Sequence, residues 1–238
     1  MLFSPIDESQ RKAIRTAGLL YLLMALTAPI GLMYVPGTLI VPGVAGATAD
    51  RIRASEWLLR VGIGSELFHQ AIGVFLVLAL YRLFKPVDKH QAQLLVILGA
   101  LVSVPIMFLN VLNEIAALTL VGGSEFLAVI GREEREALAY LFLKLHGQGV
   151  EIAAIFWGLW LFPFGILIIR SKFIPPILGY MLFIAGAAYL ASSFSTLVLP
   201  QYERTVGKFA MILEIGELPI MFWLFIRGFV PAGKTEPG

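Results

Sequence analysis

The sequence predicts an all-α, polytopic membrane protein: a bundle of six transmembrane helices with both termini in the cytoplasm. Of the 238 residues, 58% are hydrophobic and only 14% are charged, and the mean hydropathy is +0.85. Soluble domains carry about 25% charged residues, so this chain has too little charged surface for a water-facing exterior. Apolar runs of the length that a membrane helix needs, about 20 residues, recur along the whole chain.

The predicted spans follow one another with short connections, which leave no room for a second domain in residues 1–238. The first span could be mistaken for a signal peptide, because basic residues precede it. Its apolar run from Ala17 to Val35 is longer than the hydrophobic part of a signal peptide, about 7–15 residues, so we interpret it as a retained helix. The six spans lie near 14–35, 56–82, 92–121, 139–169, 177–199 and 207–229.

Lys and Arg determine the predicted orientation. With both termini inside, ten of the 18 Lys and Arg residues fall on the cytoplasmic side, including those of two tight turns at 82–89 and 170–172. Cys is absent, which excludes disulfides, thiolate catalysis and iron–sulfur clusters. Because the basic residues are scattered, nothing indicates nucleic-acid binding, and the expected partner is the lipid bilayer.

Ionisable and amide side chains occur inside the predicted spans. A charged group at mid-membrane costs about 2.5–3.5 kcal/mol on insertion scales, so these carboxylates must be protonated, paired or metal-bound. Counted along each helix, most of them fall in the outer half of the bilayer, and residues three or four apart share one helix face. We therefore predict a buried polar layer that opens toward the outer leaflet. Its residues are Glu66, His69, Asn110, Asn113, Glu114, His146, Glu151, Glu214 and Glu217.

A metal centre is the first function that this layer suggests. Glu66 and His69 have the Glu-x-x-His spacing of di-iron carboxylate bundles. Such nitrogen and oxygen ligands suit Zn, Fe or Mn, and a bound metal can activate water to hydrolyse a lipid or peptide bond in the outer leaflet. A lipid or another small molecule is therefore a candidate substrate. Glu114 and Glu151 are available to complete the ligand set. The predicted metal ligands are Glu66, His69, His146, Glu214 and Glu217.

Three other interpretations stay open. Intramembrane Glu and His chains are typical of proton relays, so the same cluster is consistent with proton-coupled transport. The polar groups can also be structural, since interhelical hydrogen bonds in membranes contribute about 0.6 kcal/mol each. Haem b with His69 and His146 as axial ligands is the least favoured, because carboxylates are poor neighbours for a porphyrin. No residue is assigned a catalytic role.

Several segments resemble a known family. Two Pro-Gly pairs after the first span, at residues 36–37 and 42–43, predict a loop that covers the polar layer, and they belong to the resemblance. The most specific segment is 155–160, Ile-Phe-Trp-Gly-Leu-Trp, and 145–147 and 214–217 also match. Together these segments resemble the uncharacterised bacterial integral membrane family called domain of unknown function 4386. The resemblance implies a multi-pass protein of the bacterial cytoplasmic membrane and implies no activity.

Overall fold

The chain folds as a bundle of long helices. A computed structural model describes residues 7–230, and every regular element in this range is helical. The elements are α1 (Glu8–Pro29), η1 (Ile30–Tyr34), α2 (Val35–Leu39), α3 (Ala45–Ala54), α4 (Glu56–Phe84), α5 (Lys89–Val96), η2 (Ile97–Val102), α6 (Ser103–Gly122), η3 (Glu125–Leu127), α7 (Arg132–Ser171), α8 (Pro176–Val198), η4 (Pro200–Tyr202), α9 (Glu203–Glu214), η5 (Ile215–Glu217) and α10 (Leu218–Phe229).

Six helical segments within residues 7–230 are long and apolar enough to cross a membrane. They confirm the predicted all-α fold class with six spans. Each segment overlaps one predicted span, and most extend beyond it by several residues. The segments are Glu8–Leu39, Glu56–Phe84, Lys89–Gly122, Arg132–Ser171, Pro176–Val198 and Pro200–Phe229.

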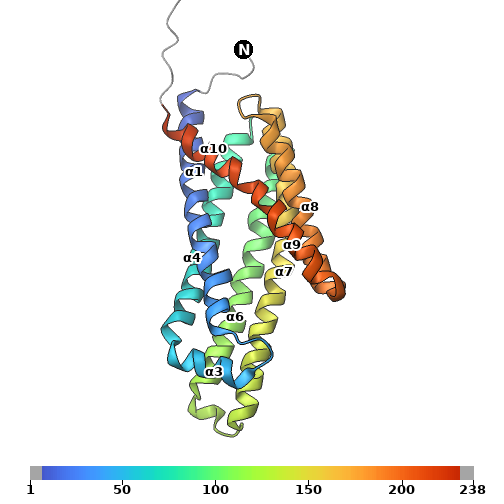
Figure 1. Cartoon of the computed structure of the whole chain (residues 1–238). Helices are drawn as coiled ribbons and strands as arrows, with labels where there is room; N and C mark the ends of the chain where they lie inside the picture. Colours follow the sequence, from blue (N-terminus) through green and yellow to red (C-terminus); the bar gives the residue numbers. More distant parts are fainter. Residues whose placement is uncertain (1–6, 231–238) are drawn as a thin grey trace, which may run out of the picture.

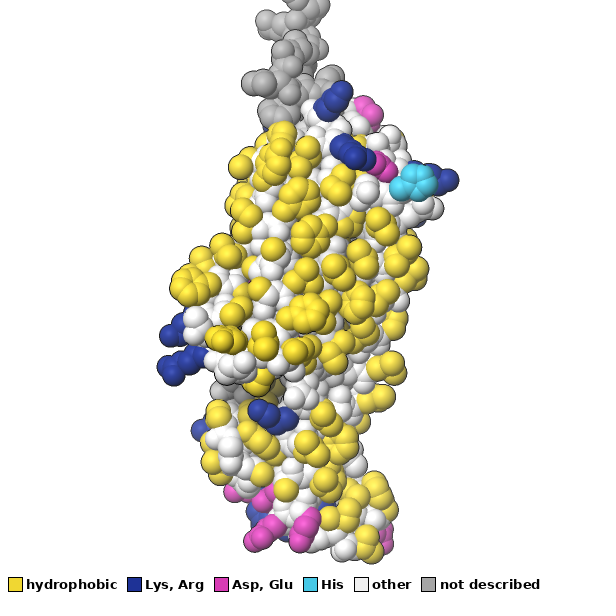
Figure 2. Space-filling view, turned by 90° about the vertical axis from the view of Figure 1, so that its right-hand side faces the viewer, with side chains coloured by type: hydrophobic (Ala, Val, Ile, Leu, Met, Phe, Trp, Pro, Cys, Tyr) yellow, Lys and Arg dark blue, Asp and Glu magenta, His cyan; other side chains and the backbone are white. Residues whose placement is uncertain are grey.

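An apolar belt surrounds the middle of the bundle. Large hydrophobic side chains such as Phe75, Leu101 and Leu109 are exposed on its outside. Figure 2 shows yellow hydrophobic side chains over the central part of one face, with charged side chains above and below them. Exposed apolar surface on this scale is typical of a lipid-facing exterior rather than a water-facing one. The chain is therefore a multi-pass membrane protein.

Both ends of the described chain lie at the same end of the bundle, at the top of Figure 1. We call this the terminal end, and the opposite end, where α3 and the start of α7 lie, the far end. At 1.5 Å per residue, the 40 residues of α7 give a length of about 60 Å. The hydrocarbon core of a bilayer is only about 30 Å thick, so the far end extends beyond it. That the terminal end faces the cytoplasm stays a prediction from the Lys and Arg residues.

Local signals set several helix ends. Asp7 and Gln10 form a capping box at the start of α1, in which each side chain accepts a hydrogen bond from the other residue's backbone N–H. Asp88 begins α5 by accepting a hydrogen bond from the Gln91 backbone N–H at 3.1 Å. α6 ends at Gly122 and is capped by Gly123, whose φ of 69° lies in the left-handed region that favours glycine.

The first span is longer than the sequence predicts. The helix continues through η1 and α2 to Leu39, whereas the Pro-Gly pair at 36–37 predicts a loop. Pro36 lies in the first turn of α2, where a missing N–H is tolerated, and η1 is a π-helical turn that ends directly before this turn. The chain reverses at Gly43, with a φ of 77°, and α3 then packs against α7 at the far end.

α7 and α8 pack with their backbones in contact. Gly158 and Gly165 on α7 face Gly186 and Gly179 on α8, respectively. A Cβ atom on Gly158 would lie 2.8 Å from the Gly186 carbonyl oxygen, and one on Gly179 would lie 2.7 Å from the Gly165 carbonyl oxygen. Glycine is required at these positions because no side chain fits between the two helices.

Two separate hydrophobic cores fill the bundle. One lies toward the terminal end and includes Phe84 and Phe164, whose ring centroids are 5.8 Å apart. The other lies toward the far end and includes Leu39, Ile52 and Leu143. On the second, third and fourth spans, buried polar side chains separate the residues of one core from those of the other. These polar side chains form the candidate site.

Candidate metal centre

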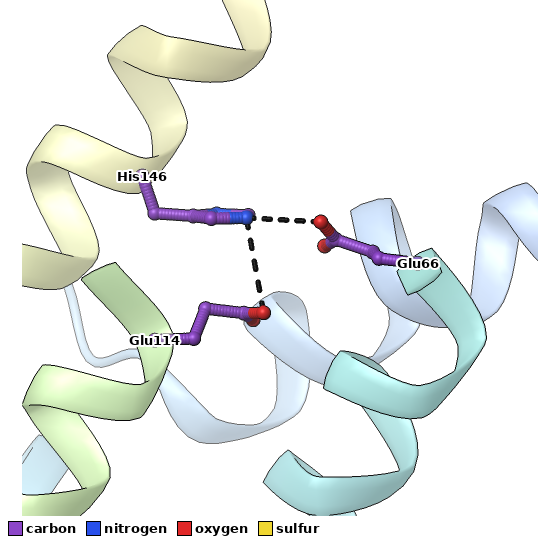
Figure 3. A group of neighbouring side chains, drawn as sticks. All are labelled: Glu66, Glu114 and His146. Atoms are coloured by element: carbon purple, nitrogen blue, oxygen red, sulfur yellow. Dashed lines mark hydrogen bonds and ion pairs between the residues drawn. The ribbon is translucent and has the colours of Figure 1, made fainter. Parts of the chain in front are cut away.

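Three ionisable side chains from three different helices meet between the two cores. They are Glu66 on α4, Glu114 on α6 and His146 on α7, and Figure 3 shows both carboxylates pointing toward the imidazole. His146 Nε2 lies 3.0 Å from Glu66 Oε2 and 3.8 Å from Glu114 Oε2. One ligand atom from each residue lies within 4.8 Å of the other two. The fold thus brings together groups that are 32 to 80 residues apart in sequence.

The three side chains are withdrawn from the surface. The exposed fractions of Glu66, Glu114 and His146 are 2%, 3% and 8%. Glu66 Oε1 and Glu114 Oε2 are buried and accept no hydrogen bond from any of the residues that the structure describes. A buried carboxylate oxygen without a partner is costly, so these two atoms are available to a ligand of the site.

The charge of the cluster can be balanced by a cation or by protons. Two carboxylates and a neutral imidazole carry a charge of −2, and protonating the imidazole leaves −1. A divalent cation with a neutral histidine would bring the site to zero, and so would two protons, one on the imidazole and one on a carboxylate. Buried charges in proteins are paired or coordinate metals, and the three ligand atoms of this cluster are close enough together for either arrangement.

Neighbouring groups fix the position of His146. The Asn110 Nδ2 donates a hydrogen bond to the His146 carbonyl oxygen at 2.9 Å, and the Asn113 Nδ2 donates to Asn110 Oδ1 at 3.1 Å. Asn110 fits because Gly149, one turn after His146, has no side chain, and a Cβ there would overlap the Asn110 carboxamide. Asn110 therefore links α6 to α7 beside the cluster, and Asn113 supports Asn110 from the same helix; neither joins the cluster.

The backbone of the first span packs against Glu66. A Cβ on Gly31, in η1, would lie 2.6 Å from Glu66 Cγ. The same span continues into α2, whose residues Val35 and Leu39 line a cavity of about 20 Å³ together with Glu114 and His146. This volume is large enough for one water molecule, which needs about 10–15 Å³. Ile40 and Ile52, from the segment that follows α2 and from α3, also line this cavity.

His69 lies outside the cluster, although it is three residues from Glu66. Its Nδ1 lies 3.1 Å from the Met24 carbonyl oxygen and 3.3 Å from Thr27 Oγ1, both on α1. Residues three apart on an α-helix differ by about 60° around its axis, so the two side chains can face different neighbours. Here Glu66 faces α7 and His69 faces α1.

The remaining predicted residues are also elsewhere. Glu217, in η5, accepts a hydrogen bond from the Tyr21 hydroxyl. Glu151 and Glu214 are half-buried on α7 and α9 and do not belong to the group. Of the five predicted metal ligands, the structure brings Glu66 and His146 together and adds Glu114. Tyr21 is not among the residues predicted for the polar layer. Its depth within the first span is the sequence feature that could have identified it as a partner of an intramembrane carboxylate.

Comparison with known proteins identifies the family. Residues 16–228 match the profile of the family described as "Domain of unknown function (DUF4386)". The chain is also similar to a protein of Archaeoglobus fulgidus named only "Uncharacterized protein", with 25% identity over 168 residues, which are 67% of this chain and 84% of that protein. No solved structure matches the chain. Since the profile spans nearly the whole sequence, the chain belongs to the DUF4386 family.

Proposed function

We propose that this protein is a membrane metalloprotein that binds a divalent cation through Glu66, Glu114 and His146. One observation carries the proposal: one carboxylate or imidazole ligand atom from each of three helices lies within 4.8 Å of the other two, in a buried site. Nitrogen and oxygen ligands of this kind suit Zn, Fe and Mn.

The ligand spacing supports a tetrahedral or five-coordinate ion. Metal–ligand distances of about 2.0–2.2 Å place neighbouring ligands of a tetrahedral Zn site about 3.3–3.6 Å apart. The distances of 3.0 and 3.8 Å from His146 Nε2 to the two carboxylates lie on either side of this range. Small side-chain rotations would therefore be enough to bind the ion.

The proposed reaction class is hydrolysis. Catalytic zinc sites keep three protein ligands and leave one position for water, whose pKa the metal lowers to about 7. The cavity of about 20 Å³ beside Glu114 and His146 offers that position. The site lies on α4 about 27 Å from the last residue of that helix, near the far boundary of a hydrocarbon core of about 30 Å. The lipid headgroup region lies at this depth, so the proposed substrate is a lipid, and a carboxylate oxygen of Glu66 or Glu114 that is not bound to the metal would accept the proton of the water.

Metal content tests the ligand set. We expect protein purified after loading with Zn²⁺ or Mn²⁺ and dialysis to retain one ion per chain by elemental analysis. Glu114→Gln and His146→Asn should abolish retention. Glu151→Gln is the matched control, because Glu151 is on the same helix as His146 but outside the cluster. His69→Asn should also retain the metal, and its loss in this variant would contradict the ligand set proposed here.

Cobalt tests the open position. Co²⁺ in a site with few ligands absorbs visible light more strongly than octahedral Co²⁺, and acetohydroxamate should change that spectrum by binding at the fourth position. A Co²⁺ protein whose spectrum does not respond to acetohydroxamate would refute the hydrolytic part of the proposal and leave metal binding intact.

A shared proton is the competing interpretation, supported by the hydrogen-bond distance of 3.0 Å between His146 Nε2 and Glu66 Oε2. It predicts no retained metal in any of these variants. It also predicts proton movement into liposomes that Glu66→Gln abolishes and Glu151→Gln does not. That result would replace the metal centre by proton-coupled transport through the same cluster.

A further inference from the structure

A larger cavity lies inside the bundle, on the terminal side of the metal centre. Its volume is about 280 Å³, near the lower end of the range for small-molecule sites, about 300–1,000 Å³. All six spans contribute to its lining, and Glu66, Glu114 and His146 do not. It is therefore a separate site, and nothing in the metal proposal depends on it.

The lining combines aromatic rings with one carboxylate. Four large aromatic residues, Tyr21, Trp157, Trp160 and Tyr189, line the cavity, and the rings of Tyr21 and Trp160 lie 6.3 Å apart at an angle of 56°. Glu217 is the single acidic residue among the described residues of the lining, which include no Lys or Arg. The other polar side chains of the lining are His69, Gln70 and Ser103.

The Glu217 carboxylate is held in place inside this lining. The Tyr21 hydroxyl on α1 donates a hydrogen bond to Glu217 Oε1. Tyr21 is buried, with an exposed fraction of 6%, so the bond links the first and last spans in the interior. The second carboxylate oxygen, Oε2, takes no part in this bond and is available to a ligand.

Departures from α-helical geometry meet at the same cavity. Two spans contain π-helical turns, η1 and η2, and the last span contains the 3₁₀ turn η5. Each of these turns places a residue in the lining: Leu32, Gly99 and Glu217, respectively. π-Helical turns are rare and are often found at functional sites, and broken helices at mid-membrane often hold ligands. The π-helical and 3₁₀ turns thus support a ligand-binding role for the cavity, independently of the chemistry of its lining.

We propose that this cavity binds a small organic cation, such as a protonated or quaternary amine with an apolar body. Tyr and Trp faces attract cations through their quadrupoles, most strongly where water is excluded. Glu217 would supply the opposite charge, and the absence of Lys and Arg from the described lining leaves no cationic residue there to repel the ligand. The apolar residues, among them Leu76, Val77 and Met221, would enclose the hydrocarbon part of the ligand.

The probe for this site is a pair of molecules with the same shape and different charge. Benzyltrimethylammonium is a quaternary cation, and neopentylbenzene is its neutral analogue with carbon in place of nitrogen. We would measure their binding by equilibrium dialysis against the protein in lipid nanodiscs, with empty nanodiscs as the blank and mass spectrometry as the readout. We expect the cation to bind saturably and the neutral analogue to bind at least about tenfold more weakly, because the charge of the ligand contributes to its affinity.

Glu217→Gln should weaken cation binding about tenfold or more while leaving the neutral analogue unchanged. Glu214→Gln is the matched control, because Glu214 lies one turn earlier on the same span and outside the lining. Equal binding of the two molecules by the unmodified protein would overturn the proposal, and so would unchanged cation binding by Glu217→Gln.

A second pair of variants keeps the test valid if Glu217→Gln does not fold. Ala28→Phe adds a ring inside the cavity and should block binding of the cation, with the charged residues unchanged. Ala187→Phe adds the same ring to an exposed position of α8 and should leave binding unchanged. Binding that survives Ala28→Phe in a folded protein would place the cation elsewhere and refute the assignment.

Discussion

Replacing Gly158 with alanine should weaken the packing of α7 against α8. A Cβ at this position would lie 2.8 Å from the Gly186 carbonyl oxygen, 3.0 Å from Tyr189 Cβ and 3.2 Å from Leu190 Cγ. Ordinary contacts of a Cβ begin at 3.4 Å, so α8 would have to move away by about 0.6 Å at the backbone. Overpacking of this kind costs about 1–3 kcal/mol.

A matched variant separates this cost from helix propensity. Gly147 is on the same helix and is exposed, and a Cβ there would meet no atom within 4 Å. Both substitutions gain about 1 kcal/mol because alanine favours a helix more than glycine does. The difference between the two variants therefore measures packing alone, and we expect Gly158→Ala to be less stable than Gly147→Ala by about 1–3 kcal/mol.

The assay is reversible unfolding in mixed micelles. Purified protein in a neutral detergent is titrated with SDS, and far-ultraviolet circular dichroism follows the loss of helix. The free energies of unfolding of the two variants and the unmodified protein are compared at the same SDS mole fraction. Equal stability of Gly158→Ala and Gly147→Ala would refute the backbone contact between α7 and α8.

Three further predictions concern the site and the two ends of the bundle. Gly149→Ala should displace Asn110 and lower metal affinity about 10–100-fold by chelator competition, whereas unchanged affinity would show that Asn110 does not position His146. A hydrogen bond from the Gln91 backbone N–H and the Arg170 guanidinium hold the pKa of Asp88 below its ordinary value. The ionised carboxylate of Asp88 therefore stabilises the fold above about pH 4. This stabilisation is lost as the pH falls below about 4 and the carboxylate is protonated at its lowered pKa. Asp88→Asn should accordingly flatten the decline of Tm below about pH 4, and an identical Tm profile would contradict this. Glu136 accepts hydrogen bonds from Arg53 at 2.5 Å and from Arg132 at 2.8 Å, so Glu136→Ala should speed hydrogen exchange across α3, Ala45–Ala54, while Glu133→Ala should not.

The sequence predicts the six spans because each must cross about 30 Å of hydrocarbon, and only a long apolar helix can do so with its backbone hydrogen bonds satisfied. It also predicts which residues share one helix face. Glu66 and Gln70 are both buried on α4, and Asn110 and Glu114 are both buried on α6, as residues four apart should be. These predictions depend on local geometry, which the order of residues determines.

The sequence does not determine which helix faces meet. Counted at 1.5 Å per residue from the last residues of α4 and α7, Glu66 and His146 differ in depth by about 10 Å, yet they form a hydrogen bond. The count fails because it assumes that all helices are upright, straight and level. The 40 residues of α7 extend beyond α4, and π-helical turns shift the register in the first and third spans.

Tertiary packing therefore decided the membership of the site. Local spacing groups Glu66 with His69, but close packing of α1 against α4 places a carbonyl oxygen beside the imidazole of His69. Glu114 joins the cluster because α6 packs against both α4 and α7. The sequence determined by itself that carboxylates and imidazoles lie inside a membrane bundle. Only the relative rotation and height of the packed helices decided which of them meet, because these depend on contacts between residues far apart in the chain.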